Sequence, residues 1–256
     1  MRSKLKLGNI ALLLASSAFA LLLCELIARL ILNPVDLNVR NVSWIPYLPR
    51  PLRHTLGRKV GVYALRGPKG YGVKEMIALK TIFFHIPKTG GLSIAEALFG
   101  NRAGGHITAE DARLIFGAWG FQRFFKFCIV RNPWDRLVSA YHYLKTHPTS
   151  SAVPLAQTHS FPDFIGFIPQ LIEEVHLRPQ SSFVSEGNGR LVVDYVGKFE
   201  QLEESFGEIC AHLGISTTLP HVNPSPHPDF RGCYTPQMWE QVKTIYWRDV
   251  EMFGYE

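Results

Sequence analysis

The sequence predicts an α/β fold in which helices flank an open, mostly parallel sheet. Two short apolar runs, 81–86 and 125–130, have the length and composition of buried strands, and each leads through a turn signal into a helical pattern. A third apolar run, 191–199, also precedes a helical pattern. Strands and helices that alternate along a chain are typical of a parallel sheet covered on both faces.

The first 33 residues predict a single membrane-spanning helix. Three basic residues precede an uncharged run of 18 residues at 7–24, which is just long enough to cross a bilayer. A cleaved signal peptide is the alternative, because the sequence AFA at 18–20 offers the small residues of a cleavage site. Hydrophobic residues continue beyond that site, which favours an anchor. Basic residues lie on both sides of the span, so its orientation stays open.

The rest of the chain divides into a linker and one main domain. Residues 34–76 are rich in Pro, Gly and Arg and predict a juxtamembrane linker, and residues 77–256 predict the folded domain. The net charge is +6, but residues 1–60 hold 9 Lys/Arg and 2 Asp/Glu, which leaves 18 and 19 for the remainder. The main domain is nearly neutral, so composition gives no argument for a nucleic-acid partner.

The four cysteines predict free thiols, because none has CxxC spacing. A disulfide between Cys210 and Cys233 is the alternative if the domain faces an oxidising compartment. Histidines and cysteines are scattered without the spacing of metal ligands, so we expect no metal site.

The first predicted strand leads through adjacent glycines into a helix. Ser93 and Glu96 have the spacing of a capping box at its start. Thr108 and Asp111 form a similar pattern, which predicts a short helix at 109–116.

The second predicted strand leads into a helix that continues to about residue 145. Asn132 is a candidate cap and Pro133 suits the first helical position. Farther on, we expect a helix at 161–176 that Pro169 interrupts. Two more helices are expected at 202–213, ending at Gly214, and at 235–252.

The turn after the first strand, PKTGGLS at 87–93, has the composition of an anion cradle. Adjacent glycines let backbone N–H groups face an anion without a Cβ in the way. The following helix N-terminus adds a partial positive charge and Lys88 adds a full one. Thr89 and Ser93 offer hydroxyl groups. The simpler alternative is a Gly-Gly turn that only joins a strand to a helix.

The turn after the second strand offers a second anion site. Arg131 lies in this turn and Ser139 lies eight residues later, two turns into the helix. A guanidinium fork and a hydroxyl on one side suit phosphate oxygens. The alternative is that Arg131 pairs with a carboxylate and Ser139 only packs. Both turns would open at the carboxyl edge of the sheet, where ligands bind in such folds.

Taken together, IPKTGGLS and IVRNPWDRLVSAY resemble the two nucleotide-binding signatures of the carbohydrate sulfotransferases. The similar branch includes heparan sulfate 2-O-sulfotransferase and the chondroitin 4-O-sulfotransferases. The resemblance covers 81–144, with weaker similarity in DYVGKFE and in YTPQ…FGYE. It implies a P-loop-NTPase-like sulfotransferase fold and the donor 3′-phosphoadenosine 5′-phosphosulfate (PAPS). The implied ligands of its 5′-phosphosulfate are Lys88, Thr89, Gly90, Gly91, Leu92 and Ser93, and those of its 3′-phosphate are Arg131 and Ser139.

One position departs from the family pattern. Leu92 stands where a second threonine is common, so one hydroxyl donor is lost and only the backbone N–H remains there. Because a hydrogen bond to a charged group contributes about 1.5–3 kcal/mol, donor affinity is expected to be reduced.

Sulfuryl transfer needs a base for the acceptor hydroxyl and a cation for the leaving phosphate. Histidine suits the first task and Lys88 the second. His106, in GGHITAED between the two signatures, lies where the resemblance places the histidine base. His85 at the end of the first strand is expected to be a packed core residue instead.

These observations favour a membrane-anchored, PAPS-dependent sulfotransferase that acts on a hydroxyl of a carbohydrate. The domain would face the Golgi lumen in a eukaryote, or the cytosol from the inner membrane in a bacterium. A nucleotide-dependent kinase or hydrolase is the first alternative, although no GxxxxGK[ST] occurs. A non-catalytic nucleotide- or glycan-binding relative is the second. The sequence leaves the oligomeric state open.

Overall fold

The computed structural model describes part of the chain: residues 73–100, 105–146, 152–220 and 229–256. These residues belong to one of the two units into which the chain divides, 71–256. The anchor predicted at 1–33 and most of the linker predicted at 34–76 lie outside the described residues, so both stay predictions. Among the described helices, none is both long and apolar enough to cross a membrane.

The described sheet has three parallel strands in the order β1 (Thr81–Phe84), β2 (Phe125–Val130) and β3 (Tyr195–Lys198). Phe84 pairs with Cys128, and Val130 pairs with Lys198. The predicted parallel sheet is therefore confirmed. The first and third strands are shorter than the apolar runs that predicted them, because His85 already begins the glycine turn and Asp194 is the last residue before β3.

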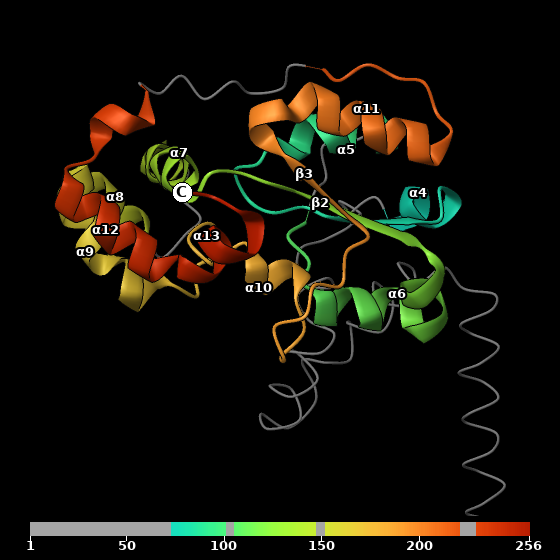
Figure 1. Ribbon diagram of the computed structural model, residues 1–256, viewed down its shortest axis with the longest axis horizontal. Helices are drawn as coiled ribbons and strands as arrows, with labels where there is room; N and C mark the ends of the chain where they lie inside the picture. Colours follow the sequence, from blue (N-terminus) through green and yellow to red (C-terminus); the bar gives the residue numbers. More distant parts are fainter. Residues whose placement is uncertain (1–72, 101–104, 147–151, 221–228) are drawn as a thin grey trace, which may run out of the picture. The chain divides into compact units, whose positions relative to one another are not determined.

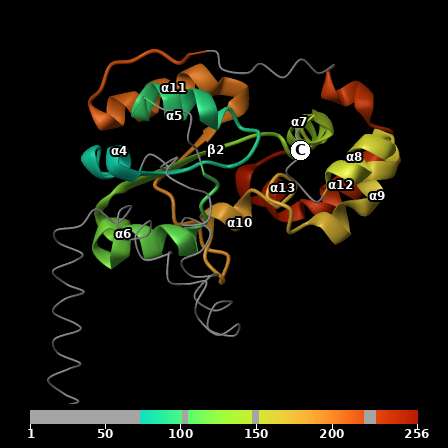
Figure 2. The same ribbon diagram turned by 180° about the vertical axis from the view of Figure 1, so that it is seen from behind.

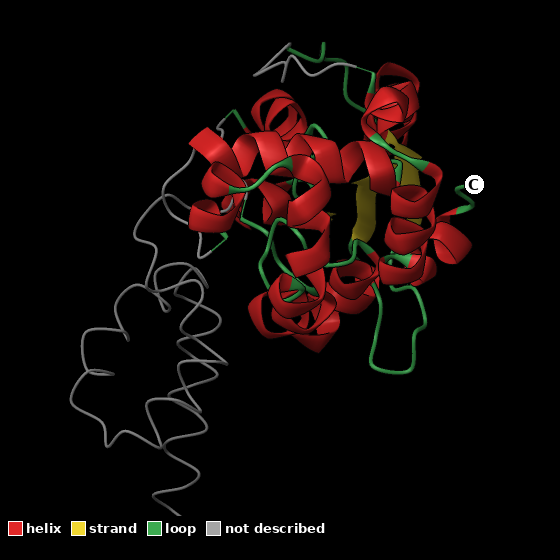
Figure 3. Cartoon of the chain, turned by 90° about the vertical axis from the view of Figure 1, so that its left-hand side faces the viewer, coloured by secondary structure: helices red, strands yellow, loops and turns green. Residues whose placement is uncertain are grey.

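Helices cover both faces of this sheet (Figures 1 and 2). One face carries α5 (Gly91–Phe99) and α11 (Leu202–Leu213), and the other carries α6 (Ala109–Arg123). A second group of helices gathers beyond the carboxyl ends of the strands: α7 (Pro133–Thr146), α8 (Val153–Thr158), α9 (Phe161–Leu171), α12 (Pro236–Ile245) and α13 (Trp247–Phe253). Short elements complete the order: α4 (Val73–Ala78), α10 (Ser181–Val184), η2 (Phe199–Gln201) and η3 (Phe230–Cys233). In the side view the helices surround the strands (Figure 3).

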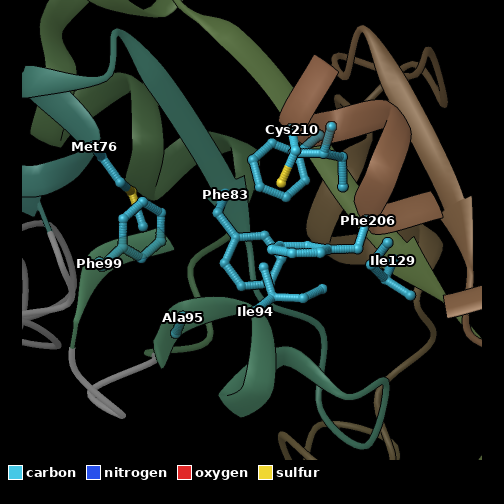
Figure 4. Close-up of a cluster of buried hydrophobic side chains, with 10 residues drawn as sticks. Met76, Phe83, Ile94, Ala95, Phe99, Ile129, Phe206 and Cys210 are labelled. Carbon is cyan, nitrogen blue, oxygen red and sulfur yellow. The ribbon is translucent and has the colours of Figure 1, made fainter. Parts of the chain in front are cut away.

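A hydrophobic cluster joins the sheet to α5 and α11 (Figure 4). Phe83 and Phe127 stack with ring centroids 4.9 Å apart on this face of the sheet. Ile94 from α5 and Phe206 from α11 pack against them, and all four side chains are almost fully buried. Burial of apolar side chains contributes about 1.5–3 kcal/mol each, so this cluster holds the glycine turn between β1 and α5 in place.

Helix α7 is buried on nearly every side, although its sequence predicts only one apolar face. Residues 133–141 are all buried. The apolar side carries Trp134, whose indole stacks on Trp239 of α12 at 4.2 Å. The opposite side carries the buried polar residues Arg136 and Ser139. Polar groups that are buried on a central helix need partners or a ligand.

Several predicted helix boundaries were wrong. Helix α5 begins at Gly91 with Gly90 as its N-cap, so Ser93 lies inside the first turn and the predicted capping box is absent. Helix α6 has the predicted Thr108–Asp111 capping box but runs on to Arg123. The last predicted helix is two helices that meet at Tyr246, whose fully buried ring fixes the break. Helix α11 ends at Gly214 as predicted.

Both glycines of the turn are required by its geometry. Gly90 has a left-handed φ of 77°, which side chains disfavour. Gly91 lies directly against the imidazole of His85, and a Cβ there would come within 1.9 Å of that ring. The turn after β1 is therefore shaped by backbone conformation at one glycine and by contact at the other.

Gly91→Ala is expected to lower the free energy of unfolding by about 1–3 kcal/mol, because the new methyl group overlaps the buried His85 ring. Thermal unfolding of the two proteins measures the difference.

Gly207→Ala is the matched control, since no described atom lies within 4 Å of a Cβ built at this helical glycine. It should raise stability by up to about 1 kcal/mol through helix propensity. Equal unfolding temperatures for Gly91→Ala and the unmodified chain would contradict the packing described for His85.

Candidate functional site

The two predicted anion-binding turns lie side by side at the carboxyl edge of the sheet. The Arg131 guanidinium donates from Nη1 to the main-chain carbonyl of Lys88 over 3.1 Å. This bond joins residues 43 positions apart in the sequence. The turn after β1 and the turn after β2 therefore form one continuous surface.

Arg131 is buried and its guanidinium is held on several sides. Nε donates to the Asp135 carboxylate over 2.8 Å, and the guanidinium carbon lies 4.1 Å from the centre of the Phe199 ring. The carboxylate pairing is the first half of the simpler alternative that the sequence left open. It orients the guanidinium, because bonds to Asp135 and to the Lys88 carbonyl fix two edges of the planar fork.

A buried hydrogen-bond network supports the Arg131 turn with residues that come much later in the sequence. The main-chain N–H of Arg131 donates to Gln180 Oε1 over 2.9 Å, and Gln180 Nε2 donates to the Arg131 carbonyl over 2.8 Å. Asp249 of α13 accepts the main-chain N–H groups of Gln180 and Ser181 over 2.7 and 2.8 Å. Its fully buried carboxylate therefore fixes the glutamine that fixes the turn.

The glycine turn offers main-chain N–H donors, but the Thr89 hydroxyl donates within the turn itself. Among the described residues, no side chain caps the N-terminus of α5. The first N–H groups of a helix lack carbonyl partners from a preceding turn, so this N-terminus could meet an anion. The Thr89 hydroxyl donates to the Ile86 carbonyl over 2.9 Å. Its one proton is thus used within the turn, and Thr89 stabilises the loop in this arrangement. Ser93 is buried in the first turn of α5, and Leu92 is half-buried beside it.

Lys88 stands at the centre of the site in a strained conformation. Its φ is 69°, a left-handed value that is uncommon for any residue except glycine. Its ammonium lies 4.3 Å from the centre of the Tyr143 ring. Burial, and then the charge of Arg131, lower the pKa of the Lys88 ammonium to about 8. The site thus holds a cation that an incoming anion would stabilise.

Ser139 is the clearest sign of an anion site. Its side chain is 1% exposed. Among the described residues, none forms a hydrogen bond with its Oγ. A buried hydroxyl without a partner is costly, so it points to a group that the protein is built to receive.

His106 lies on the loop before α6, and its ring meets the turn after β1. Nδ1 lies 2.8 Å from the His85 carbonyl, and the two imidazole centres are 4.5 Å apart. A carbonyl oxygen only accepts, so Nδ1 carries the hydrogen. In the neutral ring the lone pair is then on Nε2, which is the form a general base requires.

The structure adds residues that the sequence did not single out. Tyr143, four residues after Ser139 on the same helix, covers Lys88, and this spacing was a usable signal. His176 lies edge-on to His106 with ring centroids 5.7 Å apart, and its Nδ1 meets the Glu174 carboxylate at 3.1 Å. His176 follows a helix without any local motif, so only the fold reveals it. His85 is buried as expected and also shapes the site through Gly91 and His106.

The described cysteines Cys128, Cys210 and Cys233 are free, so the alternative disulfide is absent, and Cys24 lies outside the described residues. Within the described ranges, no group of three or more His, Cys, Asp or Glu side chains could hold a metal ion.

The arrangement suits a ligand with two separate anionic groups. One group would meet Lys88 and the N-terminus of α5. The other would meet Arg131 and the unpartnered Ser139 hydroxyl. His106 has a neutral tautomer that suits proton transfer. The residues present therefore fit a bisphosphorylated nucleotide beside a general base.

Lys88→Met is expected to raise the free energy of unfolding at pH 7 by roughly 1 kcal/mol or more, because burial disfavours the ammonium. The pKa of about 8 in the folded chain lies below the ordinary lysine value of 10.5, so the unfolded chain binds more protons between these values. Stability of the unmodified chain should therefore rise from pH 8 to 10.5, and the advantage of the variant should shrink. Denaturant unfolding at pH 7, 9 and 10 measures this. A difference that does not change with pH would contradict it.

Part of the chain is similar to a known protein family. Residues 118–256 match the sulfotransferase family, a stretch that contains Arg131, Ser139, His176 and Asp249. An uncharacterized protein of Archaeoglobus fulgidus is 26% identical over 102 residues, which covers 39% of this chain and 75% of that protein. No solved structure matches the chain. Since the family match spans more than half of the sequence, the chain belongs to the sulfotransferase family.

Proposed function

We propose that this protein transfers a sulfuryl group from PAPS to a hydroxyl of a carbohydrate. The single observation that carries the proposal is the bond from Arg131 to the Lys88 carbonyl, which joins the two candidate anion-binding turns. The buried Ser139 hydroxyl, which has no described hydrogen-bond partner, lies on the helix that follows the second turn. PAPS has a 5′-phosphosulfate and a 3′-phosphate, so one donor molecule accounts for both turns.

The 5′ end of the donor would lie against Lys88 and the first turn of α5. The glycine turn allows close approach, and the N-terminus of α5, which no described side chain caps, would offer main-chain N–H groups to the anion. The 3′-phosphate would lie against Arg131 and Ser139. Leu92 supplies a main-chain N–H but no hydroxyl, so affinity rests more heavily on Lys88.

In the transfer step, His106 accepts the proton of the acceptor hydroxyl at Nε2. The acceptor oxygen forms a bond to sulfur as the bond from sulfur to the bridging phosphate oxygen breaks. Lys88 stabilises the negative charge that develops on that bridging oxygen. The proton remains on His106 until solvent removes it, and the products are a sulfate ester and adenosine 3′,5′-bisphosphate.

Two further readings remain to be tested against this one. A kinase or hydrolase would need a lysine after the glycines of the turn, whereas Lys88 precedes them. A non-catalytic binder would need no base, whereas the bond from His106 Nδ1 to the His85 carbonyl gives the His106 ring the tautomer that a base requires. Transfer of labelled sulfate from PAPS to a panel of saccharides, lipids and small alcohols tests the enzyme directly.

We also propose that the chain is anchored through residues 1–33. The apolar run at 7–24 supports this proposal. Partition of the full-length chain into the membrane fraction, and its loss on deletion of 1–33, would test it.

Adenosine 3′,5′-bisphosphate is expected to raise the unfolding temperature of the chain, and ATP with magnesium is not. Ser139→Ala should weaken bisphosphate binding about 10- to 100-fold, since it removes a donor to a charged phosphate. The unliganded variant should keep its stability, because the hydroxyl has no described partner to lose. Calorimetric titration and thermal shift measure both quantities. Stabilisation by ATP alone would select the kinase reading.

His106→Ala is expected to lower turnover at least about 100-fold, as loss of a general base does. Binding of adenosine 3′,5′-bisphosphate should be unchanged, because the donor would lie against the two turns. His212→Ala is the control, since this exposed histidine stacks on Phe125 at the opposite end of the sheet. Near-normal turnover of the His106 variant would remove this residue from the mechanism.

A further inference from the structure

A second imidazole stands beside the proposed base. His176 and His106 meet edge to face, with ring centroids 5.7 Å apart and planes at 76°. On its other side His176 lies 4.7 Å from the Tyr143 ring, which in turn covers the Lys88 ammonium. His176 therefore belongs to one cluster of contacting side chains with the proposed base and the proposed phosphate ligand.

The nitrogen atoms of His176 have defined roles. Nδ1 lies 3.1 Å from Glu174 Oε1. The His176 side chain is 14% exposed and the Glu174 side chain is 13% exposed. A carboxylate only accepts, so Nδ1 carries the hydrogen and, in the neutral ring, Nε2 carries the lone pair. His106 has the same tautomer through the His85 carbonyl. In their neutral forms, the two neighbouring imidazoles thus both have Nε2 as the acceptor nitrogen.

Arg136 of α7 holds the segment that carries His176. This guanidinium, 2% exposed, donates to the carbonyls of His176 and Arg178 over 3.3 and 2.8 Å. Arg136 lies on the same polar side of α7 as Ser139. A buried cation that binds main-chain carbonyls holds a loop more firmly than a neutral donor would. The buried guanidinium of Arg136 therefore holds the main chain at His176 in place.

We propose that His176 binds the acceptor, accepting a hydrogen bond from a second hydroxyl that neighbours the one to be sulfated. The inference rests on the proposed function and names its substrate class: a saccharide with adjacent free hydroxyls. Neighbouring ring hydroxyls are about one hydrogen-bond length apart. Two imidazoles whose ring centroids lie 5.7 Å apart are close enough for each to form a hydrogen bond with one of two such hydroxyls. His106 takes the proton of one hydroxyl, and His176 orients the other.

The test is the kinetics of His176→Asn on matched saccharide probes. The probes are the methyl glycosides of glucose, galactose and glucuronic acid, each paired with analogues that lack one hydroxyl. On a glycoside with both hydroxyls, the variant should raise the acceptor KM about tenfold or more and change kcat by less than about threefold, because one ground-state contact is lost. The donor KM should be unchanged.

Two further variants separate binding from folding. His176→Gln is one methylene longer than His176→Asn, so its amide oxygen can reach the position of Nε2 and should recover part of the KM. Glu174→Gln, which no longer fixes the tautomer, should fall between the two. His212→Asn is the control and should match the unmodified chain. On analogues without the neighbouring hydroxyl, the unmodified chain and His176→Asn should have equal KM values.

An unchanged acceptor KM in His176→Asn would overturn the inference and leave the proposed function standing. So would a joint loss of kcat, donor binding and thermal stability, because that result indicates a structural role. If the unmodified chain binds adenosine 3′,5′-bisphosphate but sulfates none of the saccharides, the carbohydrate acceptor is wrong and this inference is wrong with it. If it does not bind the bisphosphate, the donor assignment is wrong as well.

Discussion

Parallel pairing of β1 with β2 is the constraint on which the site depends. With Phe84 opposite Cys128, the two strands end at the same edge, and the turns that follow them leave the sheet together. Antiparallel strands would send these turns to opposite edges. The bond from Arg131 to the Lys88 carbonyl then joins the turns, and α7 brings the Tyr143 ring to the Lys88 ammonium.

The site concentrates features that work against folding. Lys88 has a left-handed backbone and a partly buried ammonium, and the Ser139 hydroxyl has no described partner. The surrounding structure offsets these costs through the apolar cluster around Phe83 and through buried networks such as Asp249 with Gln180. Strain that the scaffold over-determines is common where a protein must be ready to bind a ligand.

Local patterns predicted the elements better than they predicted contacts. The strands at β1 and β2, the glycine turn and the Thr108 cap follow from residues close in sequence, as does the end of α11 at Gly214. The extent of α6 and the break at Tyr246 depend on tertiary packing, which periodicity does not report. The pairing of Arg131 with Asp135 was an open alternative, and the proton of Thr89 is used within its own turn. His176 and Glu174 reach the site only through the fold, because no motif surrounds them.

The buried carboxylate of Asp249 connects the Arg131 turn, through Gln180, to a late part of the chain. It binds Gln180, 69 residues earlier, and Gln180 binds Arg131, another 49 residues back. A nascent chain on the ribosome therefore carries both candidate anion-binding turns long before it carries the residues that support them. The Arg131 turn should reach its native conformation abruptly when α13 docks, and not gradually as the chain emerges.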